Sequence, residues 1–200
     1  MRLLPKWIQD VSKNISADSS LRPTLAWVHI TNTHVSATNA LIAIRAELDK
    51  EYVSENFPWM WIDSIPEEGI IIPSKLIDDI KFKSNKNFDV IDRKAVIRSL
   101  DGDNITILTT DLDNEVSYKS PFIKWKMPDL ESFHIDISNS EKKEEIAFNI
   151  KSMIDLLNTL KAIWHDDLIL STHAKKWIIV KPYNRREDTW WLIMPLRITE

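Results

Sequence analysis

The histidines and acidic residues are the side chains that could carry chemistry in this sequence. Five histidines occur, and no two of them stand four residues apart, the spacing that places two zinc ligands on one face of a helix. His165 is followed by Asp166 and Asp167, a cluster that could bind a cation or exchange protons. Aspartates are also common turn formers, and the cluster falls between an expected helix and an expected strand. We therefore favour a turn and predict no metal site.

Other catalytic groups are missing from the sequence. There is no cysteine, and the two glycines, Gly69 and Gly102, form no GxSxG, GxGxxG or P-loop motif. The paired acids Glu67–Glu68 and Asp78–Asp79 are typical of exposed faces. The sequence therefore predicts a protein that is not an enzyme and that binds no cofactor.

Composition sets the class of protein. Of the 200 residues, 44% are hydrophobic, which supplies enough apolar surface for one large or two small cores. The net charge of −4 gives no general attraction to nucleic acid or to anionic membranes, so any DNA contact must come from a local basic face. The opening MRLLPKWIQD is too short and polar for a secretory signal, and no apolar run reaches the ~20 residues of a membrane span. We expect a cytoplasmic protein with no membrane partner.

Three amphipathic helices are expected, separated by strands. Helical spacing of apolar residues appears in residues 3–15, after Pro73, and in residues 150–161. β-branched and aromatic runs predict strands in residues 25–31, 34–48, 57–65, 69–73, 87–92, 94–100, 104–111, 115–120, 146–149, 167–173, 176–183 and 189–198. The sequence LDGDN predicts a tight hairpin between two of them. The order strand, helix, several strands thus recurs three times at roughly 65-residue intervals, which indicates a repeated α+β fold with antiparallel sheets.

Four segments carry a family resemblance. The stretch LRPTLAWVHITNTHVSATNALIAIRAEL is similar to a strand that ends in an A-T-D-G-H-R-L-like motif, and GIIIPSKLIDDI resembles a strand-Pro-helix. KMPDLESF resembles an F-P-D-Y segment, and AFNIKSMIDLLNTLKA followed by TWWLIMPLRI resembles a last helix and a terminal M-P-M-R-L strand. These segments, in this order, resemble the bacterial sliding clamp, the DNA polymerase III beta family. The resemblance implies a DNA-clamp-like fold of about one and a half domains: residues 1–137 as a complete domain like the middle clamp domain, and 138–200 as half of the last one.

The resemblance also implies a peptide groove between the two domains. In the family this groove binds short peptides of polymerases, clamp loaders and repair proteins. Its residues here would be Thr38, Asn39, Pro128, Phe133, Leu192, Ile193, Met194, Pro195, Leu196 and Arg197. The sequence departs from the family in having Ala40, Leu41, Ile42 and Ala43 where the motif has Gly-His-Arg-Leu. The alternative is that residues 192–196 are simply a core strand.

A second implication is a ring whose helices contact DNA phosphates. The candidate residues are Lys6, Lys13, Lys75, Lys81, Lys83 and Lys151. Asp78, Asp79 and Asp155 lie among them and would cancel part of the field, so a solvated surface is the alternative. A ring would need several copies of the chain, and we expect a homo-oligomer with double-stranded DNA as a second partner. The rival hypothesis is an interaction module of the same fold that regulates a replication protein without encircling DNA.

Overall fold

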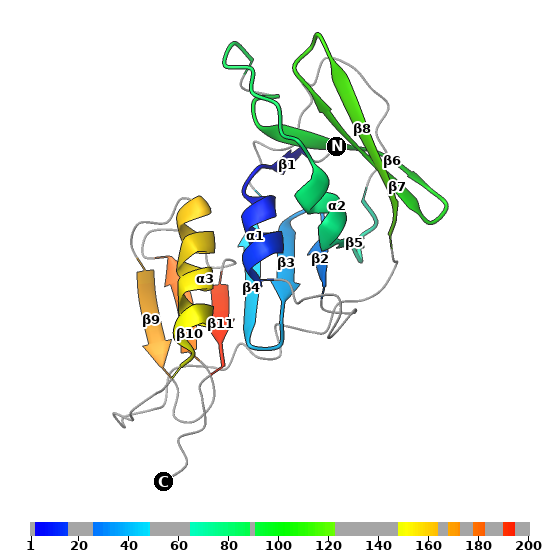
Figure 1. The fold of residues 1–200 in the computed structure, drawn as a ribbon. Helices are drawn as coiled ribbons and strands as arrows, with labels where there is room; N and C mark the ends of the chain where they lie inside the picture. The colour runs from blue at the N-terminus through cyan, green and yellow to red at the C-terminus, as the bar shows by residue number, and fades with distance from the viewer. Residues whose placement is uncertain are drawn as a thin grey trace.

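The computed structural model describes residues 3–15, 26–48, 65–88, 91–122, 148–163, 168–172, 178–182 and 190–194. In these ranges three helices form a layer in front of a seven-stranded antiparallel sheet, and a four-stranded antiparallel sheet lies beside α2 (Figure 1). None of these helices is long and apolar enough to cross a bilayer. The repeated α+β fold with antiparallel sheets is thereby confirmed.

The first two repeats each contain a strand, a helix and three further strands. The first repeat consists of β1 (Leu3–Pro5), α1 (Ile8–Ile15), β2 (Trp27–Ile30), β3 (His34–Thr38) and β4 (Ile42–Glu47). The second consists of β5 (Ile70–Pro73), α2 (Ser74–Asp79), β6 (Lys94–Asp101), β7 (Asn104–Thr110) and β8 (Glu115–Pro121). The third repeat is described from its helix onward, as α3 (Ile150–Ala162), β9 (Leu168–Thr172), β10 (Ile178–Pro182) and β11 (Trp190–Ile193).

The first two repeats exchange their first strands. β1 pairs with β6 to complete the four-stranded sheet β1-β6-β7-β8, and β5 pairs with β2. The third repeat continues the other sheet, because β11 pairs with β4. The result is a seven-stranded sheet in the order β5-β2-β3-β4-β11-β10-β9.

Alternation along the strands separates the two faces of the seven-stranded sheet. Ile42 and Ile44 of β4 and Trp191 and Ile193 of β11 belong to the main core on the helix side. The intervening residues, among them Ala43 and Leu192, form a smaller buried cluster on the other face. This is the period-2 pattern of a strand that is covered on both faces.

The helices present their apolar stripes to the same core. Ile8, Val11 and Ile15 of α1 are fully buried at intervals of three and four residues. α3 begins at a side-chain cap, since Asn149 Oδ1 accepts a hydrogen bond from the backbone N–H of Ser152 at 3.1 Å. Leu156 and Leu160 then pack into the core.

Several sequence predictions need correction. The helix expected over residues 3–15 begins only at Ile8, because the first residues form β1. The run 34–48 divides into two strands, since Ala40 adopts a left-handed backbone with φ of 72° and turns the chain. Phe148 and Asn149 lead into α3 instead of forming a strand, and the described residues of 87–92 form turns. The LDGDN hairpin is confirmed, with Gly102 at a positive φ of 58°.

Candidate peptide-binding site and helix face

The turn between β3 and β4 is held by its own polar side chains. Thr38 Oγ1 donates a hydrogen bond to the carbonyl oxygen of Ile42 at 2.8 Å. Asn39 Oδ1 accepts from the backbone N–H groups of Leu41 and Ile42, at 2.9 and 2.8 Å. These bonds fix the backbone while the Leu41 side chain stays 49% exposed. The turn therefore presents an apolar side chain on a rigid support.

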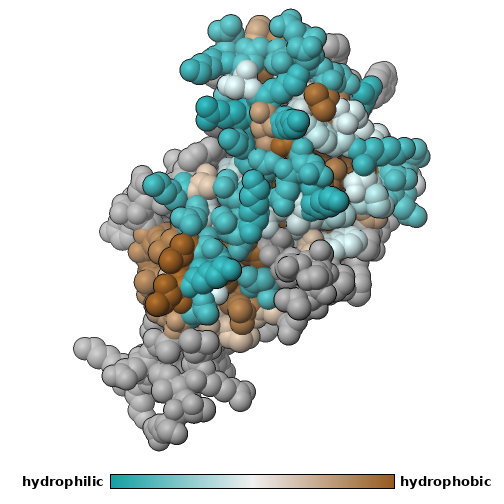
Figure 2. Space-filling model, in the orientation of Figure 1, coloured by the Kyte–Doolittle hydropathy of each residue, from teal (hydrophilic) through white to brown (hydrophobic). Residues whose placement is uncertain are grey.

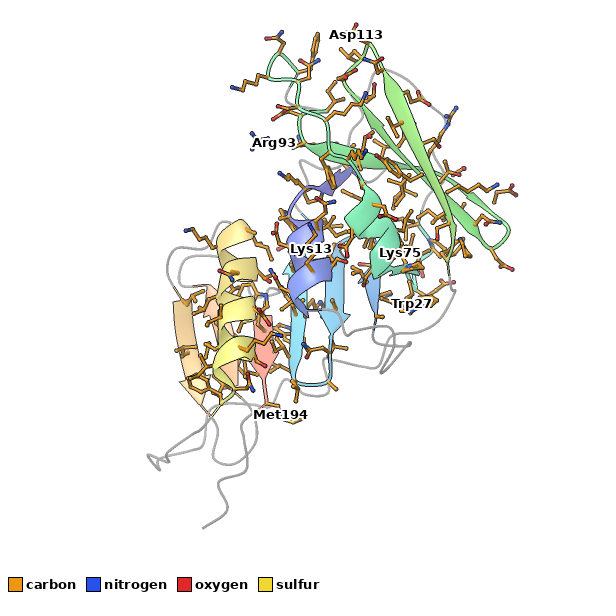
Figure 3. The ribbon with its side chains drawn as sticks, viewed as in Figure 1. Lys13, Trp27, Lys75, Arg93, Asp113 and Met194 are labelled. Carbon is orange, nitrogen blue, oxygen red and sulfur yellow. The ribbon has the colours of Figure 1, made fainter. Side chains whose placement is uncertain are left out.

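The end of β11 lies beside this turn. Leu192 pairs with Ala43 and Ile193 with Ile42, and the backbone N–H of Met194 donates to the carbonyl oxygen of Leu41 at 2.9 Å. Met194 is 38% exposed, and Figure 3 labels it at the end of the sheet where β11 stops. Leu41 and Met194 come from distant parts of the sequence, but a backbone hydrogen bond joins them. Their two exposed apolar side chains are therefore carried by neighbouring residues.

The structure brings together both described walls of the predicted groove. Thr38 pairs with Ala43, which pairs in turn with Leu192, so the three residues lie across adjacent strands. Leu192 and Ile193 are each only 1% exposed, which agrees with the alternative that they are core residues. Among the described residues of that wall, Met194 is the exposed one. The remaining predicted groove residues, Pro128, Phe133, Pro195, Leu196 and Arg197, lie outside the described residues.

Leu41 is a candidate site residue that the sequence prediction did not include. It stands where the family motif has histidine, and the sequence prediction treated it only as a departure from the motif. The available signal was an Asn followed two residues later by a large apolar residue inside a strand run, a pattern that suits a turn with an exposed apolar tip. We name Thr38, Asn39, Leu41 and Met194 the turn site.

The turn site exposes apolar side chains and carries no acid–base group of its own. Its four residues include no titratable side chain. An apolar peptide anchor that covers Leu41 or Met194 would gain roughly 1.5–3 kcal/mol per buried side chain. Among the described residues, no three His, Cys, Asp or Glu side chains gather closely enough to hold a metal ion. The predicted cluster at His165–Asp167 falls outside the described residues.

Three of the predicted DNA-contacting lysines lie on the three helices. Lys13 of α1, Lys75 of α2 and Lys151 of α3 are all exposed. Figure 3 labels Lys13 and Lys75 on the adjacent helices α1 and α2, and α1 also contacts α3. At 100° per residue, each lysine falls on the side of its helix turned away from the buried stripe. Each helix of the layer thus carries at least one exposed lysine, and α3 also carries Lys161 in its last turn.

Acidic residues share this helix face. Asp78 and Asp79 are exposed at the end of α2, and Asp155 of α3 is half-buried. Partial burial raises the pKa of Asp78, while a hydrogen bond from Ser12 and the charge of Lys13 act in the opposite direction. The face is therefore electrostatically mixed, as the sequence predicted.

The other predicted lysines have different surroundings. Lys6 and Lys81 are exposed next to β1 and α2. Lys83 instead holds the β7–β8 loop, with its Nζ 3.1 Å from Asp111 Oδ2 and 3.1 Å from the carbonyl oxygen of Asn114. The pKa of Asp111 is lowered by the backbone N–H of Asn114 and by Lys83. Because Lys83 is held in this ion pair, we do not include it among the lysines proposed to contact DNA.

Comparison with known proteins finds likeness in structure and not in sequence. No family profile matches the sequence, and no curated protein matches it significantly. The DNA polymerase III beta subunit of Borrelia burgdorferi superposes with a TM-score of 0.60 at 10% identity, over 98% of this chain and 64% of that one. The sliding clamp of Bacillus subtilis gives 0.58 at 14% identity, over 99% and 64%. PCNA of Thermococcus kodakaraensis gives 0.58 at 10% identity, over 98% and 99%.

The chain therefore has the fold of a DNA sliding clamp. The fold is shared by bacterial beta subunits and by PCNA, which confirms the clamp-like fold predicted from the sequence. This chain spans 64% of the length of the two bacterial clamps named above. PCNA of A. fulgidus, a similar structure with a TM-score of 0.51 and 11% identity, is described with the C-terminal region of FEN-1 bound to it.

Proposed function

We propose that this chain is a non-catalytic, clamp-like accessory protein of DNA replication or repair that binds short apolar peptide segments of its partners at the turn site. The observation that carries the proposal is the hydrogen-bonded contact between the end of β11 and the β3–β4 turn, which presents Leu41 and Met194 together. Support comes from the clamp fold and from the peptide-bearing PCNA of A. fulgidus. The partners would be polymerase, clamp-loader or repair proteins.

The proposal also includes the domain division made from the sequence. Residues 1–137 would form a complete clamp-like domain and 138–200 half of a second one. The reciprocal exchange of β1 and β5 supports a complete unit at the N-terminal side. The pairing of β4 with β11 would then be the junction between the two domains, and the turn site would lie on that junction.

A fluorescently labelled peptide with adjacent Leu and Phe anchors tests the proposal by anisotropy. We expect saturable binding to the full chain, and Leu41→Asp or Met194→Asp should weaken it by about 10-fold or more, since each removes one buried apolar contact. Phe88→Asp is the matched control, because Phe88 is 53% exposed in a different part of the fold and its substitution should leave affinity unchanged. Equal affinity in all four proteins would overturn the turn site as the binding surface.

DNA contact is a second candidate function. It is favoured by the placement of Lys13, Lys75 and Lys151 on three helices of one layer, turned away from the buried stripes. Lysines on such a face contact phosphates without reading sequence. A ring around DNA requires several copies of the chain. The rival function, a clamp-fold regulator that only binds peptides, requires no oligomer.

A further inference from the structure

We propose that the outer face of α3 and β9 binds the same face of a second copy of this chain, about a two-fold axis. The face consists of Ile150, Ile154 and Leu157 of α3 and Leu170 of β9. The first two repeats of the chain cover each other in a comparable way, and the dimer is independent of peptide and DNA binding.

α3 carries apolar residues on the side that faces away from its neighbour in the helix layer. Thr159 marks the side toward α1, because its Oγ1 accepts a hydrogen bond from Asn14 Nδ2 at 3.2 Å. At 100° per residue, Ile150, Ile154 and Leu157 lie about 140–180° around the helix from Thr159. Their exposed fractions are 73%, 51% and 43%. An aliphatic stripe of this kind is unusual for a helix flank that faces only water.

β9 extends the same apolar surface. It is the last strand of the seven-stranded sheet, with β10 on its inner side. Leu168 packs partly against the main core, so Leu170, two residues along, lies on the same helix side of the sheet. Leu170 is nevertheless 56% exposed. Figure 2 shows a hydrophobic area over α3 and β9 at the left edge of the molecule, beside the hydrophilic helix layer.

The second repeat shows what covers such a face in this fold. β6 holds the position in its repeat that β9 holds in the third, as the first strand after the helix. β1 pairs along the outer edge of β6, and α1 packs against α2. Under this cover Ala95 and Ile97 of β6 are each only 1% exposed. The α3–β9 face, which the described part of the chain leaves exposed, therefore matches a face that another repeat covers elsewhere in the same chain.

A second copy supplies a repeat of the required kind. The first two repeats cover each other reciprocally, since each gives its first strand to the other, and this is the relation that a two-fold axis produces. Two copies of the third repeat can pack α3 against α3 about such an axis, as α1 packs against α2. Ile154, in the middle of the stripe, would then lie near the axis and face its own symmetry mate. The dimer would hold two N-terminal units and one shared unit built from the two third repeats.

Oligomeric mass and site-directed cross-linking test the proposal. In sedimentation equilibrium we expect a two-chain species, which Ile154→Asp combined with Leu170→Lys should convert to a single chain with an unchanged far-UV circular dichroism spectrum. Phe88→Asp is the control and should remain a dimer. Because the chain contains no cysteine, a disulfide in Ile154→Cys can join only two chains. That variant should oxidise readily to a covalent dimer, and Phe88→Cys should not.

Two results would overturn the proposal. One is a wild-type protein that sediments as a single chain at every concentration. The other is an oligomer whose mass is unaffected by Ile154→Asp and Leu170→Lys and that Ile154→Cys does not cross-link, which would place the contact on another surface. Peptide binding at the turn site is measured with different variants, so the two proposals can fail separately.

Discussion

The backbone N–H of Met194 donates a hydrogen bond to the carbonyl oxygen of Leu41 at 2.9 Å, although the two residues are more than 150 positions apart. Asn39 holds the Leu41 amide from the other side of the turn. Hydrogen bonds to the backbone of Leu41 and Met194 therefore help to place their two exposed apolar side chains. The site can lose either side chain without losing its support, which makes it suitable for mutagenesis.

Replacing Ala40 with glycine should stabilise the protein. Ala40 has a φ of 72°, a conformation that costs an L-residue about 1–2 kcal/mol, whereas the entropic cost of glycine is roughly 0.5–1 kcal/mol. We expect Ala40→Gly to raise the free energy of unfolding by about 0.5–1 kcal/mol in urea denaturation. Ala43→Gly is the matched control, because Ala43 lies in β4, and this change should destabilise. A loss of stability in Ala40→Gly would contradict the left-handed turn.

Gly69→Ala should destabilise more than Gly102→Ala. Both glycines have positive φ, 82° and 58°, so both substitutions introduce backbone strain. A Cβ at Gly69 would meet His29 Nε2 at 2.5 Å and the carbonyl oxygen of Ile30 at 2.8 Å, whereas one at Gly102 meets no atom within 4 Å. We expect a difference of about 1–3 kcal/mol in the free energy of unfolding, the usual cost of overpacking. Equal losses in both variants would show that Gly69 is not enclosed as described.

Stability should fall as pH drops through the titration range of His29. Burial lowers the pKa of His29 below its ordinary value of 6.5, and the hydrogen bond to the carbonyl oxygen of Glu68 opposes this only in part. The unfolded chain therefore takes up a proton more readily than the folded chain, so the free energy of unfolding decreases between pH 6.5 and the lower folded pKa.

Urea denaturation of the wild type and His29→Gln across this range measures the effect. The wild-type curve should fall more steeply than that of the variant below pH 6.5. Asp92 and Asp111 do not interfere, because their pKa values are lowered from 3.8 and their contribution is lost only in more acidic solution. Parallel curves for the two proteins would contradict the burial of His29.

If the helix layer contacts DNA, Lys75→Glu should weaken binding to duplexes of any sequence. Removing one phosphate contact should reduce the slope of log affinity against log salt by about 1. Lys119→Glu makes the same charge change at an exposed position on β8 and should have a smaller effect. Identical salt slopes for the two variants would show that the lysines on the helices have no special role.

Local signals predicted much of this fold. Apolar residues at helical spacing identified the three helices of the described ranges, and the Asp-Gly hairpin between β6 and β7 was found from its turn residues. β1 escaped prediction because three apolar residues are too few to show a period. The break between β3 and β4 was missed because an alanine, and not a glycine, takes the left-handed position.

Contacts between distant segments could not be predicted in this way. The pairing of Ile42 with Ile193 and the ion pair of Lys83 with Asp111 join residues whose separation leaves no periodic signal. For the same reason the sequence could not show that Leu192 and Ile193 are buried while Leu41 is exposed. The sequence prediction thus named strands that lie side by side but did not identify which of their residues are exposed.

Amide NMR shifts in the ¹⁵N-labelled chain would show directly whether peptide binds at the turn site. Titration with the Leu- and Phe-containing peptide should shift the signals of Leu41 and Met194 together, with the same dissociation constant, while the signal of Phe88 stays in place. Shifts that centre on another part of the fold, or no shifts at saturating peptide, would contradict the assignment of this end of the sheet as the peptide-binding site.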